Sequence, residues 1–282
     1  MPILEVTGHI DLKDPVLVVA ISGWVDAGAV STAVGRHLTS EGEIVAAFDP
    51  DNVFDYSTSR PTMEFDGGAT ARILWPTLTI TAVPGGRNDL LVMTGTEPDS
   101  RWQEASAELA RLATAAGVTK VVAVGAIAGA VPHTLATPIM ISSTDPDFEP
   151  VGIPAARFSV PASFVNATTH LVSERCDIPS VGFWAQVPHY VSGTYWPAAE
   201  ALLTRMSGYL EVDLDLTDLH SRAQEVIARL NEAVAKRPDA IEMIRSLEAG
   251  TPDFAFDDGS NIADEVESFL RGVDDDDNNP FS

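Results

Sequence analysis

Residues 17–38 read LVVAISGWVDAGAVSTAVGRHL, and this stretch decides the fold. The apolar, largely β-branched run 16–21 predicts a strand buried on both faces. Gly23 ends that strand, and Asp26 is placed to cap a helix. The small residues 27–29 predict a close approach of the helix's first turn to another backbone or to a ligand. The apolar positions of this helix recur with helical spacing at Ala27, Val30, Val34 and Leu38.

A strand, a glycine turn and a helix at the strand's carboxyl end form the unit from which α/β folds build their sites. An ordinary strand-to-helix turn is the alternative interpretation of the same residues. A phosphate-binding turn is not indicated, because neither G-x-G-x-x-G nor G-x-x-x-x-G-K-[ST] is present.

The rest of the chain alternates between strand and helix patterns. We expect strands or extended segments at 43–48, 71–75, 78–83, 90–94, 120–124, 138–142 and 181–187, and helices at 102–116, 164–176 and 197–210. Such alternation predicts a mixed, mostly parallel sheet with helices on both faces. The Trp75-Pro76 break is too short for a crossover, so the strands on either side of it should form an antiparallel hairpin.

Two connecting segments carry further predictions. Residues 49–68 have no helical period and are expected to form a long loop of functional importance. Ser100 and Gln103 match the S-x-x-Q capping pattern, which predicts Ser100 as the cap of the following helix.

The sequence divides into three regions. Residues 1–210 form the predicted α/β domain, and 211–250 form a helical extension. The extension should be a hairpin of two helices, the first capped by Thr217 and the second running over 238–248. Residues 251–282 are an acidic, partly disordered tail in which a short amphipathic helix is expected at 261–271.

Charge and composition restrict the class of partner. The formal net charge is −24, and residues 211–282 hold 19 of the 41 acidic and 6 of the 17 basic side chains. This balance argues against nucleic acid or a membrane surface as partner and permits a basic protein partner. The single cysteine, Cys176, cannot form an internal disulfide, and no apolar run is long enough to cross a bilayer. We expect a cytoplasmic protein.

Polar residues follow four predicted strands, and they form one candidate pocket if the strand ends converge. The set consists of Trp24, Asp26, Glu97, Arg101, His133 and His189. In an enzyme, Trp24 would be a stacking wall, Arg101 an anion contact, the two carboxylates acids or hydroxyl binders, and either histidine a base. The alternative is that the histidines only bond to backbone. No metal or cofactor is expected, because no H-x-x-x-H, H-E-x-x-H or cysteine pair is present.

Six motifs occur together and in order along residues 15–250. They are GWVDAG (23–28), FDPDNVFDY (48–56), SRP (59–61), GTEPDSRW (95–102), GAIAGAVPHT (125–134) and VPHYV (187–191). In this combination the sequence resembles the proteasome assembly chaperone 2 family, in its actinobacterial branch. The resemblance implies a phosphorylase/hydrolase-like fold of the nucleoside-phosphorylase type with a C-terminal helical extension.

The resemblance also implies homo-oligomers, with a trimer favoured by analogy with the fold. Eukaryotic and archaeal relatives bind proteasome α-subunits during assembly without a cofactor, and bacterial members lack an established activity. Many of these chaperones dock through a C-terminal hydrophobic–tyrosine–any-residue tail. This sequence ends in NPFS, so we do not expect that form of docking.

Two functional hypotheses follow. The first is a non-catalytic, oligomeric binding protein with a protein partner related to the proteasome. The alternative is an enzyme that acts on a small polar metabolite, nucleoside- or phosphate-like, on a nucleoside-phosphorylase-like scaffold.

Overall fold

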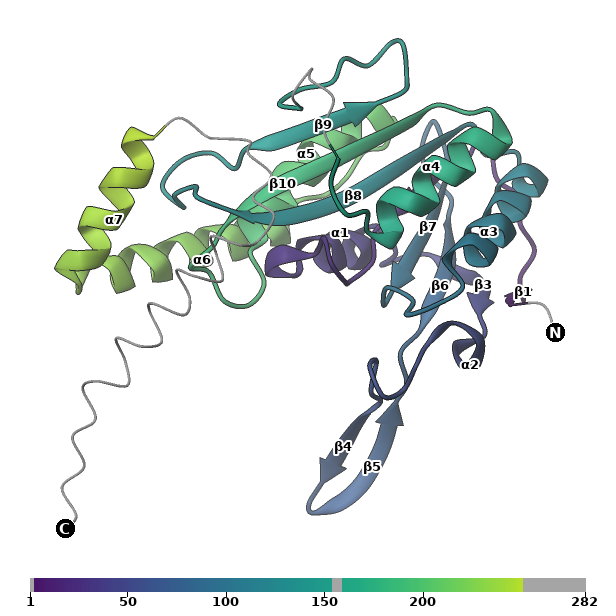
Figure 1. The fold of residues 1–282 in the computed structure, drawn as a ribbon, viewed down its shortest axis with the longest axis horizontal. Coiled ribbons are helices and arrows are strands. Elements are labelled where there is room, and N and C mark those ends of the chain that lie inside the picture. Colours follow the sequence, from purple (N-terminus) through teal and green to yellow (C-terminus); the bar gives the residue numbers. More distant parts are fainter. Residues whose placement is uncertain (1–2, 154–158, 251–282) are drawn as a thin grey trace. The chain divides into compact units, whose positions relative to one another are not determined.

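A computed structural model describes residues 3–153 and 159–250. The described residues of Met1–Ile153 and Ala162–Pro252 group into one compact unit. Its centre is an eight-stranded sheet with the strand order β1-β3-β6-β7-β2-β8-β10-β9 (Figure 1). These strands are β1 (Leu4–Val6), β2 (Val16–Val19), β3 (Glu43–Phe48), β6 (Leu78–Val83), β7 (Leu90–Gly95), β8 (Lys120–Gly129), β9 (Ile139–Ser143) and β10 (Ser180–Pro188).

Strand β2 lies in the middle of this sheet. It pairs in parallel with β7 on one side and β8 on the other, and β10 pairs in parallel with β8. The four other pairs, β1–β3, β3–β6, β6–β7 and β9–β10, are antiparallel. The sheet is therefore mixed, as predicted, but the prediction of a mostly parallel sheet is wrong. The connection between β6 and β7 is too short for a parallel crossover, so these two strands form an antiparallel hairpin, and β3 and β1 extend this half of the sheet in antiparallel pairs.

The predicted hairpin across Trp75-Pro76 is also wrong. Strand β5 (Ala69–Leu74) pairs with β4 (Thr62–Asp66) in a separate two-stranded sheet, and β6 pairs with β3 and β7 instead. Gly67 and Gly68, with φ of +56° and +88°, supply the turn between β4 and β5. We call residues 62–75 the arm. It extends away from the eight-stranded sheet (Figure 1).

The segment 49–68 is consequently not a loop throughout. It contains the short helix α2 (Pro50–Val53), whose cap is the Asp49 side chain, and then strand β4. One helical turn and one short strand are too brief to show a period in the sequence, which is why the prediction missed them.

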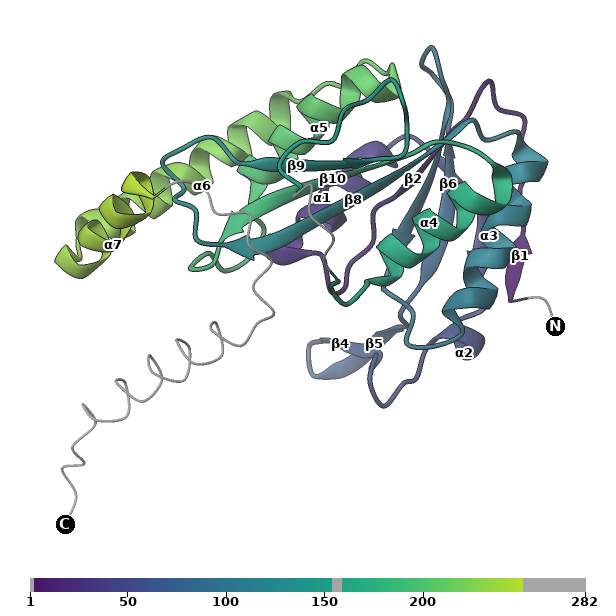
Figure 2. The same cartoon turned by 45° about the horizontal axis from the view of Figure 1, so that its top comes forward.

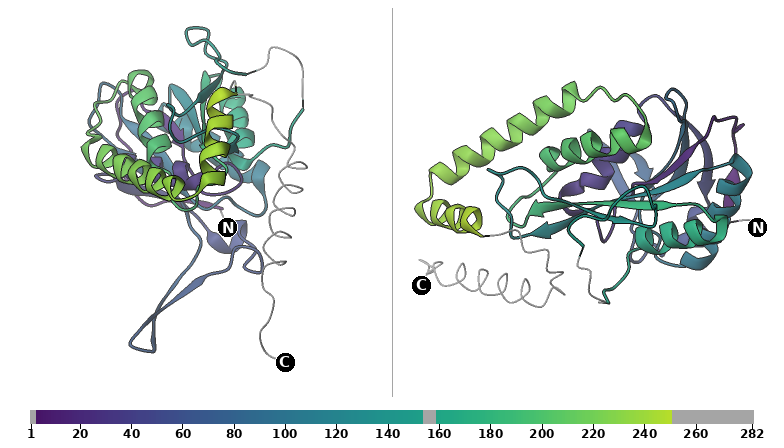
Figure 3. Two further views of the ribbon diagram at one scale, coloured as in Figure 1. Left: turned by 90° about the vertical axis from the view of Figure 1, so that its left-hand side faces the viewer. Right: turned by 90° about the horizontal axis from the view of Figure 1, so that it is seen from above.

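Helices cover both faces of the sheet, as predicted (Figure 2; Figure 3, right). Helices α1 (Val30–Leu38) and α5 (Trp196–Leu210) lie on one face, and α3 (Trp102–Ala116) and α4 (Phe164–Cys176) lie on the other. Alternate residues of β2 lie on opposite faces of the sheet. Val16 and Val18 belong to the hydrophobic cluster beneath α1 and α5, and Leu17 and Val19 lie on the face covered by α3 and α4. All four are at most 1% exposed, which confirms the prediction of a doubly buried strand.

Within residues 1–210, two helix starts differ from their predictions. Helix α1 begins at Val30, after a 3₁₀ turn (Ala27–Ala29) in which Gly28 and Ala29 have φ of +61° and +48°. Helix α3 begins after Arg101, which has φ of +58° and makes no side-chain cap, so Ser100 is not the capping residue. A left-handed residue at this corner turns the chain between Ser100 and the helix, and no sequence pattern marks it.

The extension contains the two predicted helices, α6 (Thr217–Ala235) and α7 (Pro238–Ala249). The prediction that Thr217 caps the first of them is wrong: Thr217 is the first residue of α6, and its backbone N–H donates to Asp215 Oδ1 at 3.0 Å. Helix α6 packs on α5: its buried side chains are Leu219, Ala223 and Val226, and the Arg222 guanidinium lies 4.9 Å from the Trp196 ring centroid. The boundary between domains at 210/211 stays a prediction. The expected tail of 251–282 and its helix at 261–271 lie outside the described residues.

Candidate functional site

The carboxyl ends of β2, β7, β8 and β10 share one edge of the sheet, and the six candidate residues lie on the segments that follow these ends. Each candidate residue has a defined set of contacts, and these contacts decide what it is able to do.

Glu97 ties three segments together. Its Oε2 accepts a hydrogen bond from the Trp24 backbone N–H at 2.7 Å, and its Oε1 accepts one from the Phe164 backbone N–H at 2.6 Å. The first bond fixes the turn after β2, and the second satisfies a free N–H at the start of α4. Gly23 must be glycine, because a Cβ there would lie 2.4 Å from the Glu97 carboxylate. The Trp24 side chain above this turn is 75% exposed.

Asp26 caps helix α1, as predicted, although four residues ahead of its first residue. Its Oδ1 accepts from the backbone N–H groups of Ser31 and Thr32 at 2.6 and 3.2 Å, and its Oδ2 accepts from the Thr32 hydroxyl at 2.6 Å. Burial raises the pKa of Asp26, and the hydrogen bonds from Thr32 and Ser31 oppose that rise. Its carboxylate is therefore occupied by the start of the helix.

The small trio 27–29 makes the predicted close approach, and its partner is backbone. The Tyr195 backbone N–H donates to the Gly28 carbonyl at 2.8 Å. A Cβ at Gly28 would lie 2.9 Å from the Tyr195 Cβ, so a side chain there is excluded on distance as well as on its positive φ. The buried Tyr195 hydroxyl has a pKa raised to about 12 by burial.

Arg101 is part of a surface ion pair. Its guanidinium donates to the Glu104 carboxylate at 3.0 and 2.6 Å and to Asn52 Oδ1 at 2.6 Å. These contacts hold the start of α3 against α2, so the side chain is a bridge between two helices.

His133 is buried, 2% exposed, and its protonation follows from its partners. Asn231 Oδ1 of α6 is an acceptor and lies 3.3 Å from His133 Nε2, so the ring proton is on Nε2, which donates this bond. His133 Nδ1 then accepts from the Tyr190 hydroxyl at 2.8 Å, and the same hydroxyl oxygen accepts from the His133 backbone N–H at 2.8 Å. Burial lowers the pKa of His133, which keeps the ring neutral.

His189 lies beside the same tyrosine. Its backbone N–H donates to the Gly129 carbonyl at 3.2 Å, and its ring centroid is 5.4 Å from that of Tyr190 in an edge-on arrangement. The two histidines of the VPHT and VPHY motifs thus flank one tyrosine. The contacts of this end of the sheet continue to α7, where Glu248 accepts from the Thr134 hydroxyl at 2.5 Å.

His133 also lines a cavity of about 910 Å³ between the loop 133–137, Tyr195, helix α5 and Ile227 of α6. None of the other five candidate residues lines this cavity. The structure brings Trp24 to Glu97, and His133 to His189 through Tyr190. Asp26 and Arg101 have separate partners within the described residues. A single pocket formed by all six stays a prediction.

Sequence reasoning missed three contributors: Tyr190, Tyr195 and Asn231. Tyr190 directly follows His189 in the VPHY motif, so an aromatic neighbour of a candidate histidine was the available signal. The other two have no comparable signal, because only the folded chain places α5 and α6 beside residue 133.

No group of three or more histidine, cysteine or acidic side chains is placed to hold a metal ion in residues 3–153 and 159–250. Over the same part of the chain, every helix is too short or too polar to cross a membrane.

The fold and this edge define a mixed α/β protein whose strand ends are bonded to a helical extension. The chain belongs to the PAC2 family, whose model matches residues 20–234. The expected resemblance is therefore confirmed. No curated protein matches the sequence.

Three solved structures are similar to the chain. A Mycobacterium tuberculosis protein of unknown function is 27% identical with a TM-score of 0.79, over 97% of this chain and 92% of that one. A PAC2 family protein from Streptomyces avermitilis is 33% identical with a TM-score of 0.69, over 82% and 100%. A proteasome-assembly chaperone homologue from M. tuberculosis is 29% identical with a TM-score of 0.72, over 81% and 99%.

Proposed function

We propose that the chain is a non-catalytic, homo-oligomeric binding protein with a chaperone-like role toward a protein partner related to the proteasome. Membership of the PAC2 family and likeness to a proteasome-assembly chaperone homologue support the class of partner. We further propose a cytoplasmic location, a trimer, and a fold of the nucleoside-phosphorylase type, all three by analogy with the family.

The observation that carries the proposal is the apolar face of the arm. Met63 pairs with Ile73, and Phe65 follows two residues on, so the three side chains share one face of the ribbon. They are 50%, 46% and 63% exposed, and Trp75 at the base of the arm is 51% exposed. Exposed apolar side chains gathered on one face mark an interaction surface.

The other face of the arm carries the charged pair. There Glu64 and Arg72 lie opposite each other and form an ion pair, and the neighbouring pair on that face is Thr62 and Leu74, the latter 40% exposed. A two-stranded ribbon is marginally stable in water on its own, so it needs a covering surface on its apolar side. We propose that another copy of the chain supplies that surface.

The contacts at the carboxyl edge favour this role over the enzyme alternative. Both oxygens of Glu97 accept from backbone N–H groups, and the Asp26 carboxylate accepts from the first turn of α1. The Arg101 guanidinium is shared between Glu104 and Asn52. Acids and bases held in this way maintain the structure and are not free for a substrate.

The mass in solution tests the self-association. Size-exclusion chromatography with light scattering should give a multiple of 30.0 kDa for the natural chain. The double variant Met63→Ser/Phe65→Ser should lower it toward the monomer, and the opposite-face control Glu64→Ala/Arg72→Ala should not. A natural chain that elutes as a monomer contradicts the oligomer.

The partner is tested separately. Affinity capture from the native host with the tagged chain should enrich proteasome subunits. The Met63→Ser/Phe65→Ser variant and its Glu64→Ala/Arg72→Ala control should be used as tagged bait in parallel. The loss of partner can then be compared with the loss of oligomer for each variant. No enrichment of proteasome-related proteins with the natural chain contradicts the chaperone-like role.

A further inference from the structure

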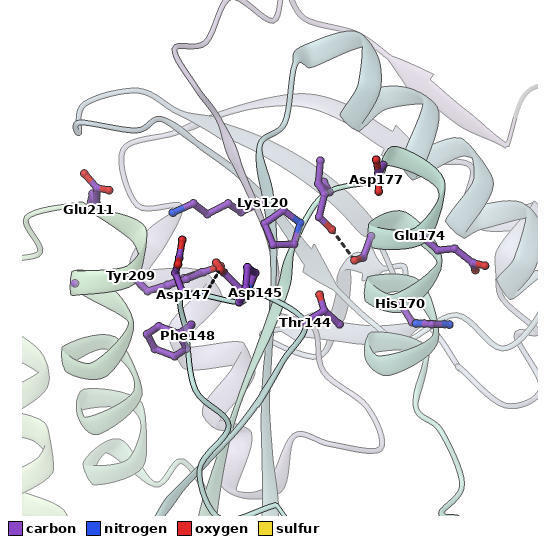
Figure 4. A pocket seen from close by; sticks show the side chains of 15 residues that line it. Lys120, Thr144, Asp145, Asp147, Phe148, His170, Glu174, Asp177, Tyr209 and Glu211 are labelled. Atoms are coloured by element: carbon purple, nitrogen blue, oxygen red, sulfur yellow. Dashed lines mark hydrogen bonds between the residues drawn. The ribbon is translucent and has the colours of Figure 1, made fainter.

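We propose that a pocket at the opposite edge of the sheet binds a lysine- and arginine-bearing segment of a partner protein. This pocket, which we call the amino-edge pocket, lies where β8 and β10 begin, between the carboxyl ends of α4 and α5 (Figure 4). Its volume is about 920 Å³, which is the size of a ligand site. It contains none of the six candidate residues and none of the arm.

The inner wall of the amino-edge pocket is aromatic and rigid. The Phe148 and Tyr209 ring centroids are 4.8 Å apart, and Phe183 of β10 packs on Phe148 at 5.8 Å. The Tyr209 hydroxyl donates to Asp145 Oδ2 at 2.8 Å, which fixes the ring. Because these side chains are already held in place, little conformational entropy is lost in ordering them when a ligand binds.

This wall already holds a cation of the chain itself. Lys120, which lines the amino-edge pocket, has its Nζ 4.8 Å from the centroid of the Tyr209 ring. The Arg205 guanidinium lies 5.7 Å from the centroid of the Phe148 ring and lines the cavity beside His133 instead. Ammonium and guanidinium groups are attracted to aromatic faces at these distances. The chain's own contacts therefore show which chemistry the pocket accepts.

The rim carries the complementary charge on both sides of the wall. Asp147 and Glu211 lie on the α5 side, and Glu174 and Asp177 lie on the α4 side (Figure 4). Glu211 pairs with Arg87, while Asp147, Glu174 and Asp177 form no ion pair within the described residues. The carboxyl ends of α4 and α5 add their negative dipole ends to this edge.

The arrangement favours a chain segment over smaller ligands. An anion would be repelled by the rim and by a net charge of −24. A bound metal is not indicated, because the described acids form no set of three placed for an ion. Acids on opposite sides of one cavity suit two basic side chains of a single segment, whose aliphatic stems would pack on the aromatic wall.

The test is a binding titration with a fluorescein-labelled peptide that carries alternating lysine and arginine residues. Fluorescence anisotropy should show binding that weakens with salt. The pocket variant Asp147→Asn/Glu174→Gln/Asp177→Asn should lose about tenfold in affinity. Lys120→Gln should bind more tightly, since it removes the cation that competes for the Tyr209 ring.

A matched control separates the pocket from the charge of the whole chain. The triple variant Glu225→Gln/Glu232→Gln/Glu242→Gln removes the same charge from exposed positions of α6 and α7 and should bind like the natural chain. Equal losses in the two triple variants overturn the proposal, and so does the absence of peptide binding. Pocket-dependent binding of spermine without binding of the peptide also overturns it, in favour of a small-cation site. None of these outcomes depends on the oligomeric mass, so the proposed function is tested independently.

Discussion

Replacement of Glu97 by alanine should lower the free energy of unfolding by about 3–4 kcal/mol. The natural carboxylate accepts two short bonds from the backbone N–H groups of Trp24 and Phe164. A hydrogen bond to a charged group contributes about 1.5–3 kcal/mol. Because Glu97 is only half-buried, we take the lower end of this range, about 1.5 kcal/mol, for each of the two bonds, which gives about 3 kcal/mol together. Its charge at the start of α4 adds roughly 0.3–1 kcal/mol.

Urea unfolding followed by far-ultraviolet circular dichroism measures this loss. Glu97→Gln keeps one acceptor oxygen and should lose about half as much. Glu104→Ala is the matched control, because it breaks only an exposed ion pair with Arg101 and should cost less than about 1 kcal/mol.

Hydrogen exchange gives a local readout of the same tie. In Glu97→Ala the Trp24 and Phe164 amides should exchange faster, relative to the rest of the chain, than in the natural protein. A loss below about 1 kcal/mol, with both amides still protected, would refute the reasoning. It would return Glu97 to the set of residues free to bind a ligand.

Three further results are expected. The pKa of Asp26 is raised above 3.8, so the folded state holds this proton more tightly than the unfolded state does. The free energy of unfolding of the natural chain, measured by urea titration relative to Asp26→Asn, should therefore fall as the pH rises from 3.8 through the raised pKa and then level off. A difference that does not change with pH contradicts this. The pKa of His133 is lowered, so its contribution to the free energy of unfolding should be complete above pH 6.5 and should decrease as the pH falls from 6.5 toward the lowered pKa. NMR titration should give a ring pKa below 6.5. His133→Gln should remove this part of the pH dependence. Gly28→Ala should lower the free energy of unfolding by about 2 kcal/mol or more, because its Cβ would meet Tyr195. Gly208→Ala, in the last turn of α5 where a Cβ would meet nothing, should raise it by about 0.5–1 kcal/mol in thermal unfolding, and equal effects would contradict the geometry.

Strands and helices with a complete period were predictable from the sequence. The run 16–21 is apolar on both faces because β2 has a strand on each side and helices above and below. The helices of the extension were equally predictable, since α6 and α7 carry apolar stripes bounded by Thr217 and Pro238. The spacing of apolar residues in each segment reflects which of its faces are buried, so it can be recognised without knowing the segment's neighbours.

Strand pairing was less predictable than strand position. The turn at Gly67 and Gly68 is the signal that pairs β4 with β5, but it is preceded by a strand too short to recognise. The extra residue Ala71, opposite the step from Glu64 to Phe65, hides the alternation of the arm further. The apolar face of the arm becomes visible only when the register is known.

The candidate site was predictable as a set of positions and not as a set of contacts. That Asp26 would cap a helix followed from the sequence, because a cap is a local interaction. The bond from Glu97 to Phe164 and the position of Asn231 beside His133 join segments that only the tertiary fold brings together. No local rule carries that information.

The central position of β2 has a consequence for synthesis of the chain. Val16 pairs with Leu90 on one side and with Lys120 on the other, so the most apolar strand leaves the ribosome long before either neighbour exists. A nascent or truncated chain that stops before β7 would present an unpaired apolar strand to other chains. Fragments of this protein should therefore aggregate until β8 is included, and the full chain should fold slowly for its length.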